Sequence, residues 1–286
     1  MQLIHSSAEL KGVLSKRKRV AFVPTMGNLH AGHLQLVEIA KQHADCVVVS
    51  IFVNPLQFGP NEDLDKYPRT LAADCEKLEA IGANVVFAPS VSEMYPGFNG
   101  KSLNQNVTIN LPAIASELCG ASRSVHFSGV ATIVSKLFNI VQPNVAVFGK
   151  KDFQQLFIIR KLVNQLNFPI EIIAGDTVRE QDGLALSSRN GKFNPAEKLQ
   201  AAQLHLTLRE VVEAIKLKQK DFITIEADAA QRLSEKGWQV DYISIRSSAT
   251  LQPASKNDGN LVILGAATLN ETRLIDNIEF CAKPLN

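Results

Sequence analysis

Short apolar runs alternate with amphipathic segments along residues 1–175 of the chain. Apolar runs bounded by turn residues predict strands at Val20–Pro24, Cys46–Val53, Asn84–Ala88, Val145–Gly149 and Ile170–Gly175. The segments between them predict helices at Leu34–His43, Thr70–Ile81, Gly129–Val141 and Asp152–Asn167. Strands that are apolar throughout are buried on both faces, which is typical of a parallel sheet covered by helices. The alternation therefore predicts a doubly wound, Rossmann-like α/β domain with its ligand at the carboxyl ends of the strands.

The pattern changes after about residue 176. Two long helical segments are followed by three β-like runs, at Pro195–Leu217, Thr224–Lys236, Gln239–Arg246, Leu261–Ala267 and Thr272–Asn277. Strands that follow one another without helices between them favour a small antiparallel sheet. We therefore expect residues 176–286 to form a smaller α+β domain, joined to the first through the polar loop Asp176–Asn190.

Composition and charge exclude several classes of protein. The 286 residues are 45% hydrophobic and 20% charged, which is typical of a globular chain and excludes a disordered or fibrous one. The formal net charge of +2 is a small excess for a protein that binds nucleic-acid phosphates. The basic run Lys16–Arg19 favours a solvated turn over a nucleic-acid patch.

The lack of recognisable targeting signals and the spacing of the cysteines indicate the cellular compartment. No apolar stretch approaches the roughly 20 residues that span a bilayer, and the first residues do not resemble a signal peptide. Four cysteines lie far apart without a CxxC pair, at Cys46, Cys75, Cys119 and Cys281. We therefore expect buried or partly buried thiols in a reducing cytoplasm, and neither a membrane nor a nucleic acid as partner.

The segment Pro24–His33 (PTMGNLHAGH) joins a predicted strand to a helix that we expect to begin at about His33. Exposed backbone N–H groups and the positive end of the helix dipole favour an anion at such a junction. Two glycines allow close approach of a phosphate, and histidines at i and i+3 can donate hydrogen bonds to it. The segment matches neither a Walker loop nor a GxGxxG fingerprint. Alternatively, the histidines only cap the helix, or they bind a metal, although no acidic or cysteine partner is nearby in sequence.

Two further segments carry groups that suit a phosphate. In Gly149–Asp152 (GKKD), glycine allows close approach of the backbone, Lys151 can neutralise phosphate charge and Asp152 can cap the next helix. Taken alone, this segment favours an ordinary polar turn. Leu186–Arg189 (LSSR) offers hydroxyls and a guanidinium that suit closure over a triphosphate, or it is only a polar linker.

These motifs together resemble one enzyme family. The HxGH tetrapeptide His30–His33 is similar to the nucleotide-binding signature of class I aminoacyl-tRNA synthetases and related nucleotidyltransferases. The full set resembles the pantothenate synthetase family, in Pro24–His33, Ser50–Phe58 (SIFVNPLQF), Tyr67–Thr70 (YPRT), Phe148–Gln155 (FGKKDFQQ) and Asp182–Asn190 (DGLALSSRN). The resemblance extends more weakly to Arg273–Asn277 (RLIDN).

The resemblance implies a reaction and a set of site residues. The family joins pantoate to β-alanine with ATP and Mg²⁺, through a pantoyl adenylate, and releases AMP and diphosphate. The implied catalytic residues are His33, His30 and Lys151, and the implied pantoate and β-alanine residues are Gln57 and Gln155. The implied ATP site comprises Met26, Gly27, Asn28, Leu29, His30, Ala31, Gly32, His33, Gly149, Lys150, Lys151, Asp152, Val178, Leu186, Ser187, Ser188 and Arg189. Mg²⁺ is expected to accompany the nucleotide without a metal site of the protein's own.

The resemblance also implies a homodimer in which residues 1–175 bind ATP and pantoate and residues 176–286 form a lid. Arg69 and Arg123 are weaker candidates for holding carboxylates. The chain departs from the family at Ser124 and Val125, where relatives carry proline and a small residue. Because a β-branched valine does not easily adopt a positive φ, the geometry of this loop stays open.

Three other functions share parts of this pattern. A nucleotidyltransferase with only the HxGH core would need a nucleotide-like second substrate and no pair of pantoate glutamines. A truncated tRNA synthetase would be expected to show a basic face. A silent nucleotide-binding protein would bind ATP without turnover, against which the intact histidines, Lys151 and LSSR segment argue.

Overall fold

The computed structural model describes residues 1–59, 64–217 and 219–282, and the chain divides into two compact units. Unit 1 comprises Met1–Lys150 and Gln154–Asp176, and unit 2 comprises Lys151–Phe153 and Thr177–Asn286. Each unit has its own hydrophobic core. Lys151–Phe153, which begin with the last two residues of the GKKD segment, thus group with unit 2 although the chain on either side of them belongs to unit 1.

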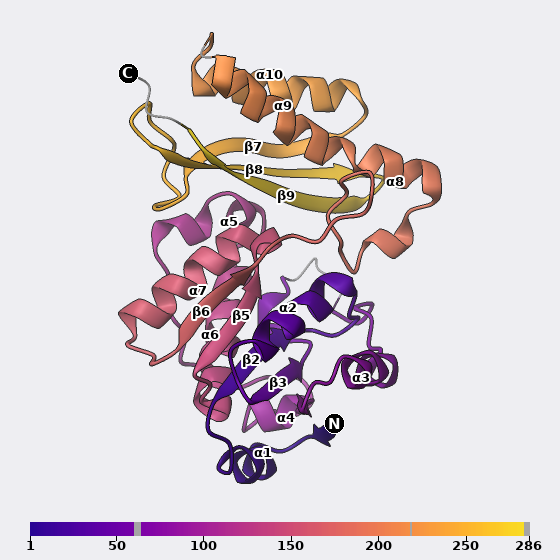
Figure 1. Cartoon of the computed structure of the whole chain (residues 1–286), viewed down its shortest axis with the longest axis vertical. Coiled ribbons are helices and arrows are strands. Elements are labelled where there is room, and N and C mark those ends of the chain that lie inside the picture. The colour runs from indigo at the N-terminus through magenta and orange to yellow at the C-terminus, as the bar shows by residue number, and fades with distance from the viewer. Residues whose placement is uncertain (60–63, 218, 283–286) are drawn as a thin grey trace. The chain divides into compact units, whose positions relative to one another are not determined.

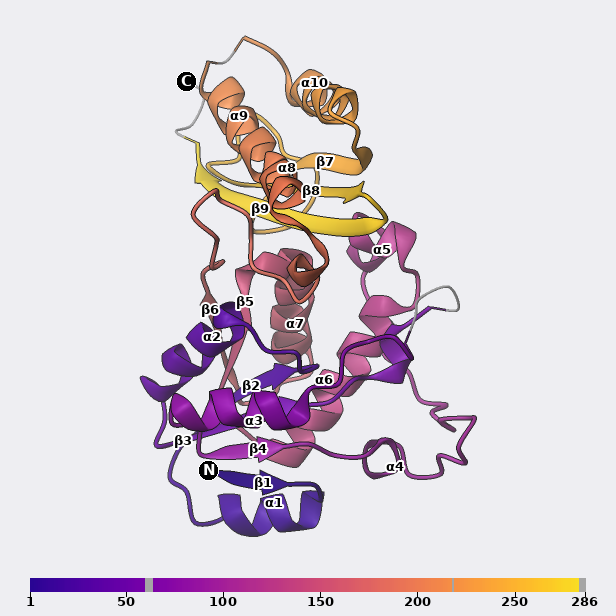
Figure 2. The same ribbon diagram turned by 90° about the vertical axis from the view of Figure 1, so that its right-hand side faces the viewer.

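Unit 1 is built on a six-stranded parallel sheet with the order β1-β4-β3-β2-β5-β6 (Figures 1 and 2). The strands are β1 Gln2–Ile4, β2 Val20–Thr25, β3 Cys46–Ile51, β4 Val85–Phe87, β5 Val145–Gly149 and β6 Glu171–Gly175. From β2 the chain builds outwards to β3 and β4, and it then returns to place β5 on the other side of β2. The strand order therefore reverses between β2 and β5, which is where a doubly wound sheet binds its ligand.

Helices cover both faces of this sheet, as Figure 2 shows. The α-helices of this part of the chain are α1 Ser7–Leu14, α2 Ala31–Lys41, α3 Leu71–Ala80, α4 Val91–Met94, α5 Cys119–Ser122, α6 His126–Val141 and α7 Phe153–Gln165. Successive residues of β2 face opposite cores, because Ala21 and Val23 pack with α2 and α3, whereas Val20 and Phe22 pack with α6. The expected doubly wound α/β fold is confirmed. Strand β1 and helix α1 were not predicted, since each is short.

Unit 2 is an antiparallel sheet of order β7-β8-β9 with helices on one face (Figures 1 and 2). Its elements are α8 Pro195–Ala201, α9 Gln203–Leu217, α10 Phe222–Glu235, β7 Gln239–Ser247, β8 Asn260–Leu269 and β9 Thr272–Cys281. The expected α+β class is confirmed, but the predicted helix Pro195–Leu217 is two helices that meet at Ala202. Within the described ranges, no helix has both the length and the apolar character needed to cross a membrane.

The cysteines differ in exposure. Cys46 and Cys119 are buried and Cys75 is partly buried, as expected from the sequence. Cys281 is exposed, so the expectation of a buried thiol is wrong for this residue. It is the last residue of β9, where pairing with β8 ends.

Candidate active site

The loop after β2 carries the histidines. Helix α2 begins at Ala31 with His30 as its N-cap, two residues before the predicted start, so the HxGH tetrapeptide forms the first turn of the helix. Gly27 has a φ of +84°, in the left-handed region that glycine adopts without strain. An added Cβ on Gly27 would lie 3.0 Å from the Ile51 side chain, so the turn needs glycine for space as well.

A buried carboxylate organises this loop from helix α3. Asp74 is fully buried and accepts hydrogen bonds from the backbone N–H groups of Asn28 and Leu29, both at 2.8 Å. Its third donor is the hydroxyl of Thr70 at 3.0 Å, so Thr70 occupies the N-cap position of α3 without capping it. The expectation that these backbone N–H groups are exposed for an anion is therefore wrong at residues 28 and 29. No pattern in the sequence marks Asp74.

The two histidines are oriented by their own backbone. Nδ1 of His30 accepts from the N–H of Gly32 at 3.2 Å, and Nδ1 of His33 accepts from the N–H of His30 at 3.3 Å. A neutral imidazole that accepts at one nitrogen carries its proton on the other, so these bonds assign the proton to Nε2 in both rings. The ring centroids lie 4.1 Å apart, and both side chains are partly exposed. Both histidines therefore take part in capping α2, and each does so through Nδ1.

Gln57 lies near this loop, in a short 3-10 helix after β3, Pro55–Gln57. It is 6% exposed, its Oε1 accepts from Asn54 Nδ2 at 3.2 Å, and its Nε2 contacts the sulfur of Met26. Asn54 is in turn held by the hydroxyl of Tyr95 and by the carbonyl of Gly129. Asn54 therefore orients Gln57, and sequence reasoning missed it although an asparagine before a proline ends the strand segment.

The adjacent glutamines of α7 differ in their surroundings. Gln155 is partly buried, and no residue in the described ranges hydrogen-bonds its side chain. Gln154 is 4% exposed and donates to the carbonyls of Ile114 and Glu117 at 2.7 and 2.9 Å. It also accepts from the N–H of Cys119 at 3.1 Å. Gln154 thus fixes the 114–119 segment, whereas the amide of Gln155 is available to a ligand.

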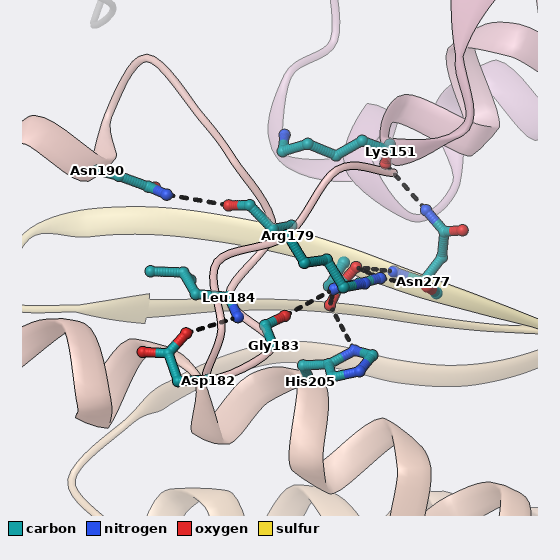
Figure 3. Close-up of polar contacts among 10 residues, drawn as sticks. Lys151, Arg179, Asp182, Gly183, Leu184, Asn190, His205 and Asn277 are labelled. Atoms are coloured by element: carbon teal, nitrogen blue, oxygen red, sulfur yellow. Dashed lines mark hydrogen bonds and ion pairs between the residues drawn. The ribbon is translucent and has the colours of Figure 1, made fainter. Parts of the chain in front are cut away.

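The two lysines after β5 also differ. Lys150 forms an ion pair with Asp176 at 2.8 Å. Lys151 lies 3.9 Å from the carboxylate of Asp152, and its carbonyl accepts from Asn277 Nδ2 at 2.9 Å (Figure 3). Asn277 therefore fixes the main chain of Lys151 in unit 2. Gly149 ends β5 beside Gly175 of β6.

Residues 178–186 form a hairpin. The N–H of Leu186 donates to the carbonyl of Val178, and the N–H of Glu180 donates to the carbonyl of Leu184, both at 2.9 Å. After the hairpin, Ser187 and Ser188 are partly buried and Arg189 is exposed. The segment is anchored at both ends, by buried residues Leu184 and Ala185 before it and by buried Asn190 after it. Asn190 Nδ2 donates to the Ala185 carbonyl at 3.0 Å, which joins the two ends (Figure 3).

The departure at Ser124 and Val125 does not strain the loop. Val125 has a φ of −94° in the right-handed region, and the positive φ of this segment is at Leu118. His126 follows and is 9% exposed, with Nδ1 3.1 Å from the Gln57 carbonyl and Nε2 3.3 Å from Arg123. Arg69 donates to main-chain carbonyls of its own turn, at residues 64 and 65.

The fold and the histidine-bearing turn at the strand-order reversal define a nucleotide-binding α/β enzyme. The model of the pantoate-β-alanine ligase family matches residues 2–279, nearly the whole chain. The chain therefore belongs to the pantoate–β-alanine ligase family, whose members form pantothenate. The match includes both units, so it does not favour a protein that shares only the HxGH core.

Individual relatives agree with this assignment. The pantothenate synthetase of Methylobacillus flagellatus is 61% identical over 280 residues, which cover 98% of this chain and 99% of that protein. The crystal structure of the Thermus thermophilus enzyme superposes with a TM-score of 0.87 at 41% identity, over 97% of this chain and 99% of that one. A Francisella tularensis pantoate-β-alanine ligase, solved with beta-gamma ATP and β-alanine, gives a TM-score of 0.79 at 32% identity, over 97% of both chains.

Proposed function

We propose that the chain condenses pantoate with β-alanine, consumes ATP and releases AMP and diphosphate through a pantoyl adenylate. The family match over residues 2–279 carries this proposal. The orientation of the imidazole pair supports it, because two N–H donors at one helix start suit an α-phosphate that gains negative charge.

In the proposed first step, an oxygen of the pantoate carboxylate attacks the α-phosphorus of ATP, and the bond to the bridging oxygen of diphosphate breaks. Nε2–H of His30 and His33 donates to the α-phosphate oxygens as charge develops, with His33 as the catalytic donor. Lys151 offsets the charge of the phosphates. These groups act by positioning and electrostatic stabilisation, which carry most of the catalysis of such a step.

In the proposed second step, the neutral amine of β-alanine attacks the acyl carbon, AMP leaves and the nitrogen loses a proton. Gln57 and Gln155 hold the pantoyl group. Among the residues that the structure describes, Nε2 of Gln57 donates to the thioether of Met26, which is a weak acceptor, so a hydroxyl or carboxylate of pantoate would replace it favourably. Gln155 can donate and accept without losing a bond within the described part of the chain.

We further propose a role for each part of the chain and the remaining residues of the ATP site. Residues 1–175 bind ATP and pantoate, and residues 176–286 act as the lid. The residues assigned to ATP besides His30, His33 and Lys151 are Met26, Gly27, Asn28, Leu29, Ala31, Gly32, Gly149, Lys150, Asp152, Val178, Leu186, Ser187, Ser188 and Arg189. Mg²⁺ enters bound to the phosphates of ATP, which is how this ion commonly binds in such sites.

A homodimer in the cytoplasm completes the proposal, on the strength of the family resemblance. Light scattering of the purified chain tests the assembly. A mass of two chains at micromolar concentration is expected, and a mass of one chain would contradict it.

The proposed reaction is tested by AMP formation with pantoate alone, with β-alanine alone and with both. Sustained AMP and pantothenate formation is expected only with both acids. Turnover that needs a nucleotide-like co-substrate would support a nucleotidyltransferase instead. ATP binding without AMP formation in any mixture would support a silent nucleotide-binding protein.

A further inference from the structure

The RLIDN segment, Arg273–Asn277, has no task in the proposed function. Its last two residues, Asp276 and Asn277, are polar but only 5% and 6% exposed in the middle of β9. Buried polar side chains are costly unless they are hydrogen-bonded, so their partners indicate what they do. Successive residues of a strand point to opposite faces, so the two side chains reach different neighbours.

Asp276 binds the base of the 178–186 hairpin. Its carboxylate accepts from both terminal nitrogens of Arg179, at 2.6 and 2.8 Å, and contacts Nδ1 of His205 at 3.1 Å. Burial disfavours the charged carboxylate, but the hydrogen bonds from His205 and Arg179 outweigh it and hold its pKa below the usual value. This bidentate pair is a strong and directional contact.

Arg179 passes this constraint to the turn of the hairpin. Its Nη1 also donates to the carbonyl of Gly183 at 3.0 Å, across the loop (Figure 3). Gly183 has a φ of +93°, and an added Cβ would lie 2.8 Å from the ring of His205. The turn at Gly183 therefore packs directly on His205, and Arg179 hydrogen-bonds its carbonyl. Because Asp276 holds Arg179, it fixes the segment that leads into Leu186–Arg189.

Asn277 reaches a second segment of the proposed site. Its Nδ2 donates to the Lys151 carbonyl at 2.9 Å, and its own carbonyl accepts from Arg179 at 3.3 Å (Figure 3). Two adjacent residues of one strand thus hold the main chain of Lys151 and the hairpin before the LSSR segment. These segments carry two of the cationic side chains assigned to the phosphates of ATP.

We propose that Asp276 and Asn277 are positioning residues of the ligase reaction, which preset Lys151 and the 178–186 hairpin for the nucleotide. The proposal rests on the assignment of Lys151 and Arg189 to ATP. Neither residue touches substrate in it; Asn277 acts through the main chain of Lys151, and Asp276 acts through Arg179 on the hairpin that leads into Leu186–Arg189. A displacement of about 1 Å in a catalytic group can cost about 10²-fold in rate, so one lost hydrogen bond is enough.

The test is a double-mutant cycle on the single-turnover rate of pantoyl adenylate formation at saturating ATP and pantoate. Asn277→Leu should lower this rate by about 10-fold or more and change the KM for pantoate less than twofold. In a Lys151→Ala background, the same change should have less than a twofold effect, because its route of action is already lost. A general folding defect would lower the rate by the same factor in both backgrounds.

Matched variants separate positioning from stability. Asn277→Asp keeps the size of the side chain and removes its N–H donor, so it should show the same coupling even if Asn277→Leu folds poorly. Arg273→Gln is the control in the same segment, since Arg273 pairs with Asp241 and contacts neither Lys151 nor the hairpin in the described part of the chain. It should stay within twofold of wild type.

Substitution of Asp276 provides a second, independent test. Asp276→Asn keeps the shape but removes the charge that holds Arg179, so adenylate formation should slow by about 10-fold or more. This loss should shrink to less than twofold in an Arg189→Ala background, because Asp276 acts through the segment that carries Arg189.

The outcomes distinguish this proposal from the proposed function. Wild-type rates for Asn277→Asp and Asp276→Asn, or equal losses in both backgrounds, overturn the positioning roles and leave the ligase assignment intact. A wild-type rate for Lys151→Ala removes Lys151 from the chemistry and overturns the role of Asn277 with it. Absence of any pantoate-dependent adenylate in the wild type overturns the proposed function itself.

Discussion

Hydrogen bonds to ring nitrogens determine what His30 and His33 can do. Each Nδ1 accepts a backbone N–H of the first turn of α2, so each ring presents Nε2–H as its donor. Donation of this kind needs no positive charge on the ring. The backbone amides of Asn28 and Leu29 are meanwhile bound to Asp74. In the proposed reaction, the donors to the α-phosphate are therefore the imidazoles and not these two amides.

Replacing His33 with alanine should lower the rate of pantoyl adenylate formation by about 10²-fold or more, which is typical of a removed transition-state donor. Single-turnover mixing of enzyme with ATP and pantoate measures this rate. His43→Ala, just beyond the carboxyl end of α2, is the control and should leave the rate unchanged. A near wild-type rate for His33→Ala would remove His33 from the chemistry.

Substitutions of the two neighbouring glutamines of α7 should have different effects, on substrate specificity for Gln155 and on stability for Gln154. Wild type should use pantoate lacking its 2-hydroxyl about 10²-fold less well, since a site built for a hydroxyl is left unpaired without it. Gln155→Leu should lose most of this discrimination in kcat/KM, with the Kd of ATP nearly unchanged. If Gln155→Leu weakens ATP as much as pantoate, or still rejects the analogue, its assignment to pantoate is wrong.

Gln154→Leu is the matched comparison. It removes three hydrogen bonds, those that Gln154 donates to the carbonyls of Ile114 and Glu117 and the one that it accepts from the amide of Cys119. We expect a loss of about 1–3 kcal/mol in the free energy of unfolding, since each such bond contributes about 1 kcal/mol. Discrimination between pantoate and its analogue should persist in this variant.

At the scale of elements, the hairpin 178–186 limits how much of the loop Asp182–Asn190 can move. The amides of Glu180 and Leu186 already donate across the hairpin, and Asn190 closes the other end. When ATP and pantoate bind together, amide exchange should therefore slow mainly at residues 187–189. Water reaching the mixed anhydride would hydrolyse it, so closure should precede its formation. Unchanged exchange in the ternary complex would reject closure of residues 187–189 over the nucleotide, and α10, which belongs to the same unit but carries no proposed site residue, serves as the reference.

The strands and long helices of unit 1 were predictable because apolar runs mark the buried strands and amphipathic segments mark the helices between them. The start of α2 was placed two residues late because a histidine is not a usual N-cap, although His30 serves as one here. The contacts of Asp74 with residues 28 and 29, and of Asn54 with Gly129, could not be predicted, since these backbone groups are 45 to 75 positions away and only the fold brings them close. The hairpin and its contact with Asp276 were missed for the same reason, because Arg179 and Asp276 are 97 positions apart.

At the scale of the whole molecule, each unit has its own core, and unit 2 contains an ion pair between buried Asp276 and partly buried Arg179 whose contribution to stability depends on pH. The pKa of Asp276 is lowered in the folded state, so this carboxylate contributes stability above its unfolded pKa of about 3.9. That contribution is lost as the pH falls from about 4 through the lower folded pKa.

Asp276→Asn should therefore be less stable than wild type at pH 7, by about 3–5 kcal/mol for a broken buried pair, and the difference should shrink as the pH falls below about 4. Urea unfolding at several pH values measures this. Asp241→Asn removes the partly exposed pair with Arg273 and should cost about 1 kcal/mol or less. A difference that is constant from pH 7 to pH 3 would contradict the ionised buried pair.

Exchange of labelled diphosphate into ATP tests most directly whether the carboxylate of pantoate is activated before the amine reacts. An adenylate formed reversibly on the enzyme returns label to ATP without β-alanine. We predict exchange that requires pantoate, proceeds in the absence of β-alanine and falls by about 10²-fold or more in His33→Ala. Exchange that requires β-alanine, or that proceeds without pantoate, would contradict a pantoyl adenylate made by this chain.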